Sequence, residues 1–313
     1  MSAGASDVKT LREKTGAGIL DCKNALDEVD GDIDEAADYL RRKGLEAAQA
    51  KSAQTAEGKV GTHILENNQI GVLVEVNCQT DFVANTDAFG EFVEAVAKHI
   101  AVENPSGNNE LIEQPYTEGS DKTIQELLNE TVAEVDENIN IQWFVRYEVD
   151  QNEAGKIGTY IHMGGNIGVI VEVTAEDSSV DDSDELGKFV NEVAMQIAAQ
   201  NPRYISRKDV PENVLEEEKG VIKDQVDDIE EKPEDVQEQI LEGKLESDFF
   251  QEEVLLEQTY IRDTDLTIEE LLKEVVAEID ENVNIRRFER FEVGEGVEVE
   301  EEDFAEEVAE EIG

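Results

Sequence analysis

The chain has 313 residues, enough for two or three domains with separate cores. Its 26 basic and 78 acidic side chains give a formal net charge of −52, which argues against direct nucleic-acid binding through a basic surface. Self-repulsion of that size destabilises a compact fold in dilute buffer and is screened at molar salt, so we expect a halophilic protein. Disorder is disfavoured because 39% of the residues are hydrophobic and periodically spaced.

Targeting signals are not apparent. Residues 1–10 contain no apolar stretch, and no run approaches the ~18 apolar residues of a membrane span. Cys22 and Cys78 are the only cysteines and form no CxxC pair, which predicts two reduced thiols in a reducing compartment. We therefore expect a cytoplasmic protein with no signal peptide and no membrane contact.

The N-terminal segment is predicted to form three short helices within residues 7–44. Between the first two, Gly16 and Gly18 indicate a tight turn followed by the apolar pair Ile19 and Leu20. That pair either packs inward or forms an exposed contact patch. Residues 1–60 carry 9 − 12 = −3 charges, against 17 − 66 = −49 for the rest. Either the charge of a small unit simply varies less, or its surface is kept less acidic because it docks on an acidic partner.

An internal repeat organises the middle of the chain. The segment GKVGT at 58–62 recurs as GKIGT at 155–159, and IGV at 70–72 recurs at 167–169, both 97 residues on. A Thr-x-x-Glu capping box at Thr123 recurs at Thr267, 144 residues on. β-branched runs around short turns predict antiparallel hairpins, and apolar spacings of 3 and 4 predict helices. Each half is therefore predicted to be a ββααβ unit.

The second half holds 144 − 97 = 47 additional residues, between Pro202 and Thr267. Apolar residues seven apart predict an antiparallel helical hairpin of coiled-coil type, the arm. Its apolar stripe either packs on its own subunit or joins a second copy of the chain, as in a homodimer, or another protein. The stripe consists of Leu215, Ile222 and Ile229.

The last 20 residues hold ten acids and no base, and Phe304, Val308 and Ile312 predict a short amphipathic helix that must dock to be stable. The whole chain is expected to be an α+β protein. Its expected domains are residues 1–54, the first core half at 55–150, the second at 151–202 with 251–293, the arm at 203–250, and a C-terminal module at 294–313.

The segment NCQTDFVA at 77–84 follows a predicted strand and precedes a predicted helix. Its Phe82 is either a core residue or an exposed contact residue. The repeat supplies an internal control, because Asp81 and Phe82 correspond to Ser178 and Ser179, whereas Val83 corresponds to Val180. Since the same fold omits the aromatic in its second copy, we predict that Phe82 points outward.

Motifs of chemical catalysis are missing from the sequence. There is no GxxxxGK[ST] phosphate loop and no EF-hand pattern, and acidic pairs are too frequent here to be diagnostic. His63 and His99 fall in a predicted strand and helix and are expected to be structural, whereas His162 at a hairpin tip is a candidate surface contact. We expect an interaction protein without a cofactor or metal rather than an enzyme; a metal-dependent hydrolase is disfavoured.

Two segments carry a family resemblance. LREKTGAGILDCK at 11–23 and NCQTDFVA at 77–84 resemble the two signature motifs of the bacterial elongation factor Ts family. The similarity continues through residues 164–173, 282–293 and 303–305, so it covers essentially the whole chain. Where family members have Met-Met, this chain has Ile19 and Leu20, which keeps the apolar character, and the net charge of −52 departs from most members.

The resemblance implies a ubiquitin-associated-like (UBA-like) N-terminal domain, a duplicated core, a coiled-coil arm and a C-terminal helix. It implies a guanine-nucleotide exchange factor that binds elongation factor Tu in its GDP-bound and nucleotide-free states. A non-catalytic scaffold protein is the alternative. The resemblance also assigns residues: Thr80, Asp81, Phe82 and Val83 would disturb the partner's Mg²⁺ site, and Arg12, Ile19, Leu20, His162 and Phe304 would contact the partner.

Overall fold

The computed structural model describes residues 10–11, 23, 25–26, 29, 33, 36, 39, 55–65, 68–116, 122–150, 152–177, 183–226, 229 and 232–295. The chain divides into two compact units, residues 1–56 with 296–313, and residues 57–295. Arg12, Ile19, Leu20, Cys22 and Phe304 lie outside the described residues, so the predictions made for them stay predictions. So do the UBA-like domain and the C-terminal helix.

In the first unit, the described residues form a small apolar cluster. Leu11, Ala25, Leu26 and Ala36 are fully buried, and partly buried side chains pack against them. The helical positions among them fall within the segment that is predicted to form three helices.

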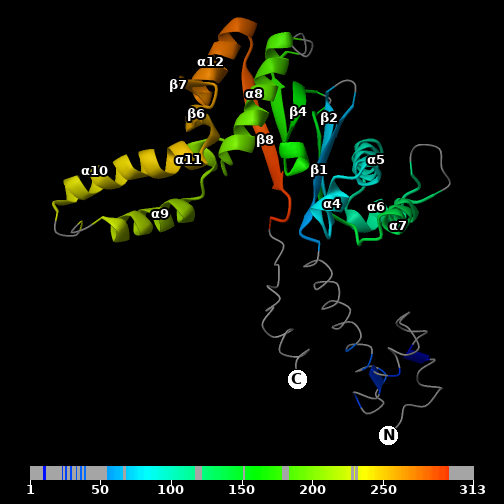
Figure 1. Cartoon of the computed structure of the whole chain (residues 1–313). Helices are drawn as coiled ribbons and strands as arrows, with labels where there is room; N and C mark the ends of the chain where they lie inside the picture. Colours follow the sequence, from blue (N-terminus) through cyan, green and yellow to red (C-terminus); the bar gives the residue numbers. More distant parts are fainter. Residues whose placement is uncertain are drawn as a thin grey trace. The chain divides into compact units, whose positions relative to one another are not determined.

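The second unit contains two three-stranded antiparallel sheets, ordered β1-β2-β3 and β4-β5-β8 (Figure 1). The predicted α+β class with antiparallel sheets is confirmed. The first half consists of β1 (Glu57–Ile64), β2 (Ile70–Cys78), α4 (Asp81–Ala84), α5 (Asp87–Glu103), α6 (Asn108–Glu113), α7 (Ile124–Val135) and β3 (Asn140–Glu148). The second half consists of β4 (Ala154–His162), η1 (Met163–Gly165), β5 (Ile167–Ala175), α8 (Asp184–Gln200), α12 (Ile268–Ile279) and β8 (Val283–Glu292).

Local sequence explains the matching elements of the two halves. Helix α5 is capped by Thr86 and ends at Asn104 in the left-handed conformation; α8 is capped by Ser183 and ends at Asn201 in the same conformation. In both sheets the register with the third strand shifts by one residue, opposite Glu75 and Val76 in the first half and opposite Glu172 and Val173 in the second. The two halves therefore share the helix caps, the left-handed helix ends and the register shifts as well as the order of their elements.

The core has three apolar layers. One lies between β1-β2-β3 and helices α5 and α7, and a second lies between β4-β5-β8 and helices α8 and α12. The third layer joins the faces of the two sheets and contains Val60, Leu73, Ile157 and Ile170 among its buried residues. The sheets thus pack face to face with helices outside them (Figure 1).

Two equivalent glycines allow the sheets to approach each other. A Cβ atom on Gly71 would lie 2.6 Å from Ile157 Cγ2, closer than real Cβ contacts. A Cβ on Gly168, 97 residues on, would meet Val60 and Leu73, the latter at 2.8 Å. Close packing of this kind leaves no room for a side chain at either position.

The additional residues form a helical hairpin, α9 (Glu212–Gln225) and α10 (Glu234–Lys244), that projects from the second half (Figure 1). Ile222 is 1% exposed and packs with Val210, Leu245, Phe249 and Val254. This burial favours the alternative in which the apolar stripe packs on its own subunit. The return path contains η3 (Arg207–Asp209), η5 (Leu245–Phe250), α11 (Gln251–Glu253), η6 (Leu255–Glu257), β6 (Thr259–Tyr260) and β7 (Asp263–Thr267).

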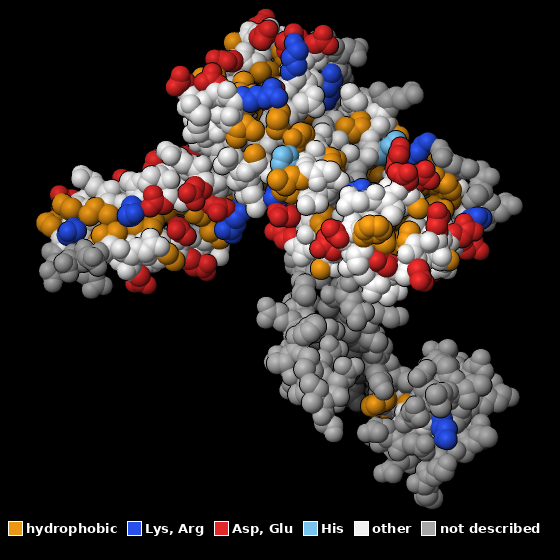
Figure 2. All heavy atoms as spheres, viewed as in Figure 1, with side chains coloured by type: hydrophobic (Ala, Val, Ile, Leu, Met, Phe, Trp, Pro, Cys, Tyr) orange, Lys and Arg blue, Asp and Glu red, His pale blue; other side chains and the backbone are white. Residues whose placement is uncertain are grey.

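Acidic side chains are spread over the described surface, with basic side chains between them (Figure 2). Among the described residues, none of the helices has the length and apolar character needed to cross a bilayer.

Candidate functional site

The candidate site is the one-turn helix α4, which begins directly after β2. Thr80 is its N-cap: the Thr80 hydroxyl accepts a hydrogen bond from the Val83 N–H at 3.3 Å. At the other end, the Asn85 amide donates to the Asp81 carbonyl at 2.7 Å, and the Thr86 hydroxyl donates to the Val83 carbonyl at 2.8 Å. A single helical turn is unstable alone, and here side chains satisfy its terminal groups.

A carboxylate distant in sequence fixes the start of this turn. Glu137, just after α7, accepts from the Thr80 N–H at 3.1 Å and from the Thr80 hydroxyl at 2.6 Å. Next to it, the Asn138 N–H donates to the Gln79 side-chain oxygen at 3.3 Å. The connection between β2 and α5 is thus tied to the α7–β3 connection, and α4 has a defined orientation.

The four predicted contact residues, Thr80 to Val83, are called the contact element below, and they divide into two groups. Thr80, Asp81 and Phe82 are exposed, whereas Val83 is buried in the core under α4. Phe82 is 81% exposed, the largest fraction among the described large apolar side chains. The core alternative for Phe82 is therefore wrong, and Val83 serves as the anchor of the turn rather than as an outward contact.

An exposed phenyl ring on an anchored turn is well suited to binding another protein. Burying such a side chain stabilises a protein or complex by roughly 1.5–3 kcal/mol. In this chain Phe82 is not buried, so that stabilisation is available to a complex. The turn itself is already ordered, so docking the ring on another protein requires little further loss of conformational entropy.

Cys78 lies at the base of the contact element but has no reactive character. It is fully buried, and its thiol donates to the Thr80 carbonyl at 3.2 Å. Burial, with a smaller contribution from Glu137, raises the pKa of the Cys78 thiol to about 11. Since the thiolate is the nucleophile, Cys78 is a structural residue here.

The three histidines have different surroundings. His162 ends β4, its Nδ1 lies 3.3 Å from the Tyr160 hydroxyl, and the two rings stack. Burial and Lys98 lower the pKa of His63, and His99 is buried with its Nε2 2.9 Å from Gln114 Oε1. His162 and the contact element belong to different halves of the core.

Sequence reasoning missed the neighbour of His162. Met163 is 71% exposed and has a φ of 49°, in the left-handed region that few non-glycine residues adopt. The signal was available, because a methionine in a four-residue hairpin turn has no core to fill.

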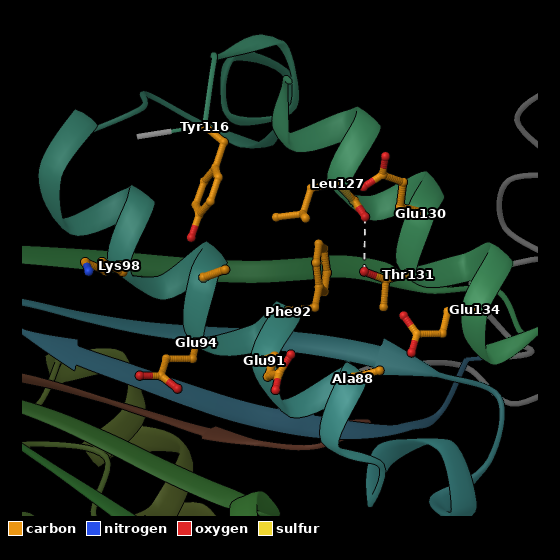
Figure 3. Close-up of a pocket in the computed structure, with 11 residues that line it drawn as sticks. Ala88, Glu91, Phe92, Glu94, Lys98, Tyr116, Leu127, Glu130, Thr131 and Glu134 are labelled. Carbon is orange, nitrogen blue, oxygen red and sulfur yellow. Dashed lines mark hydrogen bonds between the residues drawn. The ribbon is translucent and has the colours of Figure 1, made fainter. Parts of the chain in front are cut away.

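A hollow of about 490 Å³ lies between α5 and α7, which otherwise pack against each other. Figure 3 shows the residues that line it. Phe92 and Leu127 lie between the two helices, and the Thr131 hydroxyl is used by its own helix through the Leu127 carbonyl. Ala88 and Ala95 also line the hollow. The equivalent residues of the second half, 97 positions on, are Glu185 and Glu192. No group of three or more His, Cys, Asp or Glu side chains in the described parts of the chain could hold a metal ion.

The structure thus defines a class: an α+β protein with a duplicated core, an exposed contact element on one copy and a helical arm on the other. The chain belongs to the elongation factor Ts family, whose model, described as Elongation factor TS, matches residues 79–295. It is 42% identical over 310 residues to elongation factor Ts of Trichlorobacter lovleyi, covering 99% of this chain and 98% of the relative. It is 42% identical over 313 residues to that of Halothermothrix orenii, covering 100% and 99%. The protein of Nostoc sp. strain PCC 7120 is 41% identical over 308 residues, covering 98% and 97%.

Proposed function

We propose that this chain is a cytoplasmic guanine-nucleotide exchange factor for elongation factor Tu. It binds the GDP-bound partner, displaces Mg²⁺ and promotes release of GDP, so that GTP can bind. The observation that carries the proposal is Phe82, 81% exposed on a turn that is capped at both ends and held by Glu137. Family membership supplies the partner.

The mechanism is a matter of linked binding equilibria. An exchange factor binds the nucleotide-free partner more tightly than the GDP-bound one, so its binding weakens GDP by the same factor. Phe82, inserted between packed elements near the partner's Mg²⁺ site, would supply the strain. Loss of the metal removes the largest local charge that holds the phosphates. No covalent intermediate and no cofactor of this chain takes part.

Further contacts are assigned by the resemblance. Arg12, Ile19 and Leu20 of the N-terminal unit would bind the partner's nucleotide domain, and the segment around Phe304 would hold the partner as well. His162 would contact it from the second half, and the exposed Met163 beside it adds apolar area there.

The first prediction tests Phe82. In Phe82→Ala, we expect GDP release from elongation factor Tu to slow toward the uncatalysed rate, because the strain is lost. The free energy of unfolding should change by less than about 0.5 kcal/mol, since the ring is exposed. The measurement is release of fluorescent GDP at molar salt, with circular dichroism as the test of folding.

Trp143→Ala is the matched control, because Trp143 is also aromatic and is 56% exposed on β3, outside the contact element. It should leave the exchange rate unchanged. An unaltered rate in Phe82→Ala would refute the role of Phe82. If the wild-type chain binds elongation factor Tu but does not accelerate GDP release, the scaffold alternative is correct.

A further inference from the structure

The outer edges of the two sheets are covered differently. Strands β3 and β8 each end a sheet, so each has one unpaired edge. In the first half the Asn108 amide donates to the backbone carbonyls of Ile141 at 2.9 Å and Gln142 at 3.1 Å, which covers that edge. Beside residues 286–290 of β8, the second half carries Ile205, which has no polar group to donate.

The corresponding carbonyls on β8 belong to Ile285 and Arg286, 144 positions after Ile141 and Gln142. No described side chain donates to either of them. Strand β8 is therefore an edge strand without cover from a described side chain at its register shift, the kind of edge that accepts an additional strand.

A hollow of about 540 Å³ lies along this edge, between residues 201–205 and residues 286–290. It is lined by four arginines and two acids, in a chain in which acids outnumber bases three to one. Arg203, Arg286 and Arg287 have side chains that are 57%, 44% and 44% exposed. The two acids are Asp209 and Glu289.

The partners of the two outermost arginines leave donors available. Arg203 is 3.7 Å from Glu253 and donates to the Tyr204 hydroxyl at 3.4 Å. Arg286 pairs with Glu153, whose side chain is 45% exposed, and lies 3.7 Å from the buried Glu172. A guanidinium has five N–H donors, so these contacts leave some donors of each arginine available. Asp209, by contrast, already accepts two hydrogen bonds from the serine three residues before it and does not compete for these arginines.

The fourth arginine provides an independent observation. Arg146 in the first half donates from Nε to the Ala101 carbonyl at 3.1 Å. Arg290, its equivalent, has a side chain that is only 9% exposed, yet its Nε is buried without a partner in the described structure. A buried unsatisfied donor is costly, so this wall of the hollow is less well satisfied than its counterpart in the first half.

We propose that the β8 edge binds an extended acidic segment of a partner protein by strand addition, with its carboxylates on Arg203 and Arg286. The surface is separate from the contact element, so the inference does not depend on exchange activity. The arginines repel a second β8 edge and attract carboxylates, which favours an acidic strand over pairing between copies of this chain.

High salt favours a peptide over RNA. RNA affinity comes mainly from phosphate contacts that weaken steeply with salt. Strand addition contributes main-chain hydrogen bonds, which do not depend on long-range charge.

The test uses the full chain and a fluorescein-labelled peptide of alternating Glu and Thr, followed by fluorescence anisotropy at molar salt. We expect saturable binding that weakens at least about tenfold in the double variant Arg203→Gln with Arg286→Gln, because two charge-assisted contacts are lost. Gln is the residue that the first half carries at the position of Arg286. The control is Lys122→Gln with Lys273→Gln, which removes equal charge elsewhere and should bind as the wild type does.

A second readout distinguishes strand addition from simple ion pairing. Backbone amides of residues 284–290 should gain hydrogen-exchange protection with the peptide, and those of residues 140–146 should not. Ile205→Asn, which introduces an amide beside β8 like that of Asn108 beside β3, should weaken binding as well. Equal binding in the arginine variant, binding without protection of β8, or tighter binding of poly-uridine RNA than of the peptide would each overturn the proposal.

Discussion

At the scale of single residues, the contact element depends on one threonine. Thr80 accepts from the Val83 N–H, and both its hydroxyl and its N–H donate to Glu137. Phe82 makes no comparable bond of its own and owes its position to this cap. Phe82 would perform the function, and Thr80, two residues before it, holds the turn in place.

We therefore expect Thr80→Val to slow GDP release although Phe82 is retained. Loss of the cap should lower the free energy of unfolding by about 1 kcal/mol. Thr123→Val is the matched control, because Thr123 caps α7 through a complete capping box outside the contact element. It should lower stability by a similar amount without changing the exchange rate. Equal slowing in both variants would mean that stability, not the geometry of α4, determines the rate. Urea unfolding and fluorescent GDP release are the measurements.

At the scale of elements, the repeat places two glutamates at equivalent positions in the middle strands. Glu172 is fully buried and paired with Arg287 on β8. Glu75 is 1% exposed, and its carboxylate accepts from the Asn77 amide and the Gly294 N–H, with no basic partner in the described part of the chain. Opposite Glu75, β3 carries Trp143 where β8 carries Arg287.

Replacing each by glutamine should have different results. Glu172→Gln should destabilise by about 1–3 kcal/mol, because Arg287 loses its charged partner. Burial raises the pKa of Glu75 above its ordinary value of 4.5, so the folded state keeps the proton to higher pH than the unfolded chain does. The wild type then loses stability as pH rises from 4.5 through the raised pKa, whereas Glu75→Gln does not.

Glu75→Gln should therefore gain stability relative to the wild type as the pH rises from 4.5 through the raised pKa of Glu75. Urea unfolding at molar salt and several pH values measures this difference. A stability difference that is independent of pH would show that Glu75 titrates normally in the folded chain.

The packing of the two sheets gives a prediction about glycine. Gly71→Ala should destabilise by about 1–3 kcal/mol, because the new methyl group collides with Ile157 between the sheets. At Gly90 in α5, no atom lies within 4 Å of the place that a methyl group would take, so Gly90→Ala should stabilise by about 0.5–1 kcal/mol through helix propensity. Thermal unfolding compares the two, and opposite signs are expected. A neutral Gly71→Ala would mean that the sheets separate easily at this point.

At the scale of the whole molecule, charge governs stability. With a net charge of −52, lowering the salt lengthens the range of repulsion from about 3 Å at molar salt to about 10 Å at a tenth of that. We expect the melting temperature to fall and structure to be lost on dialysis into dilute buffer. Circular dichroism melts across a salt series measure this. The same melting temperature throughout would contradict the halophilic interpretation.

In the arm, sequence periodicity predicted the helices but not what they pack against. The spacing of Leu215, Ile222 and Ile229 predicted a helical hairpin, and α9 and α10 are present. It left open what the stripe packs against, and Ile222 proves to be buried within its own subunit. A homodimer through the arm remains a prediction. The arm offers it less exposed apolar area than the sequence suggested, because Ile222 is already buried.

The sequence by itself determined the main elements, their duplication, the caps at Thr123 and Thr267, and the family. Those features depend on residues within about four positions of one another, or on direct comparison of the two copies. Only the tertiary structure decided that Glu137 holds Thr80, that Glu172 has a basic partner and Glu75 has none, and that the β8 edge is open. Those partners are separated by as many as 115 positions, as for Arg287 and Glu172. Which of two equivalent positions obtains a partner depends on how the strands and helices pack, and no local pattern in the chain records it.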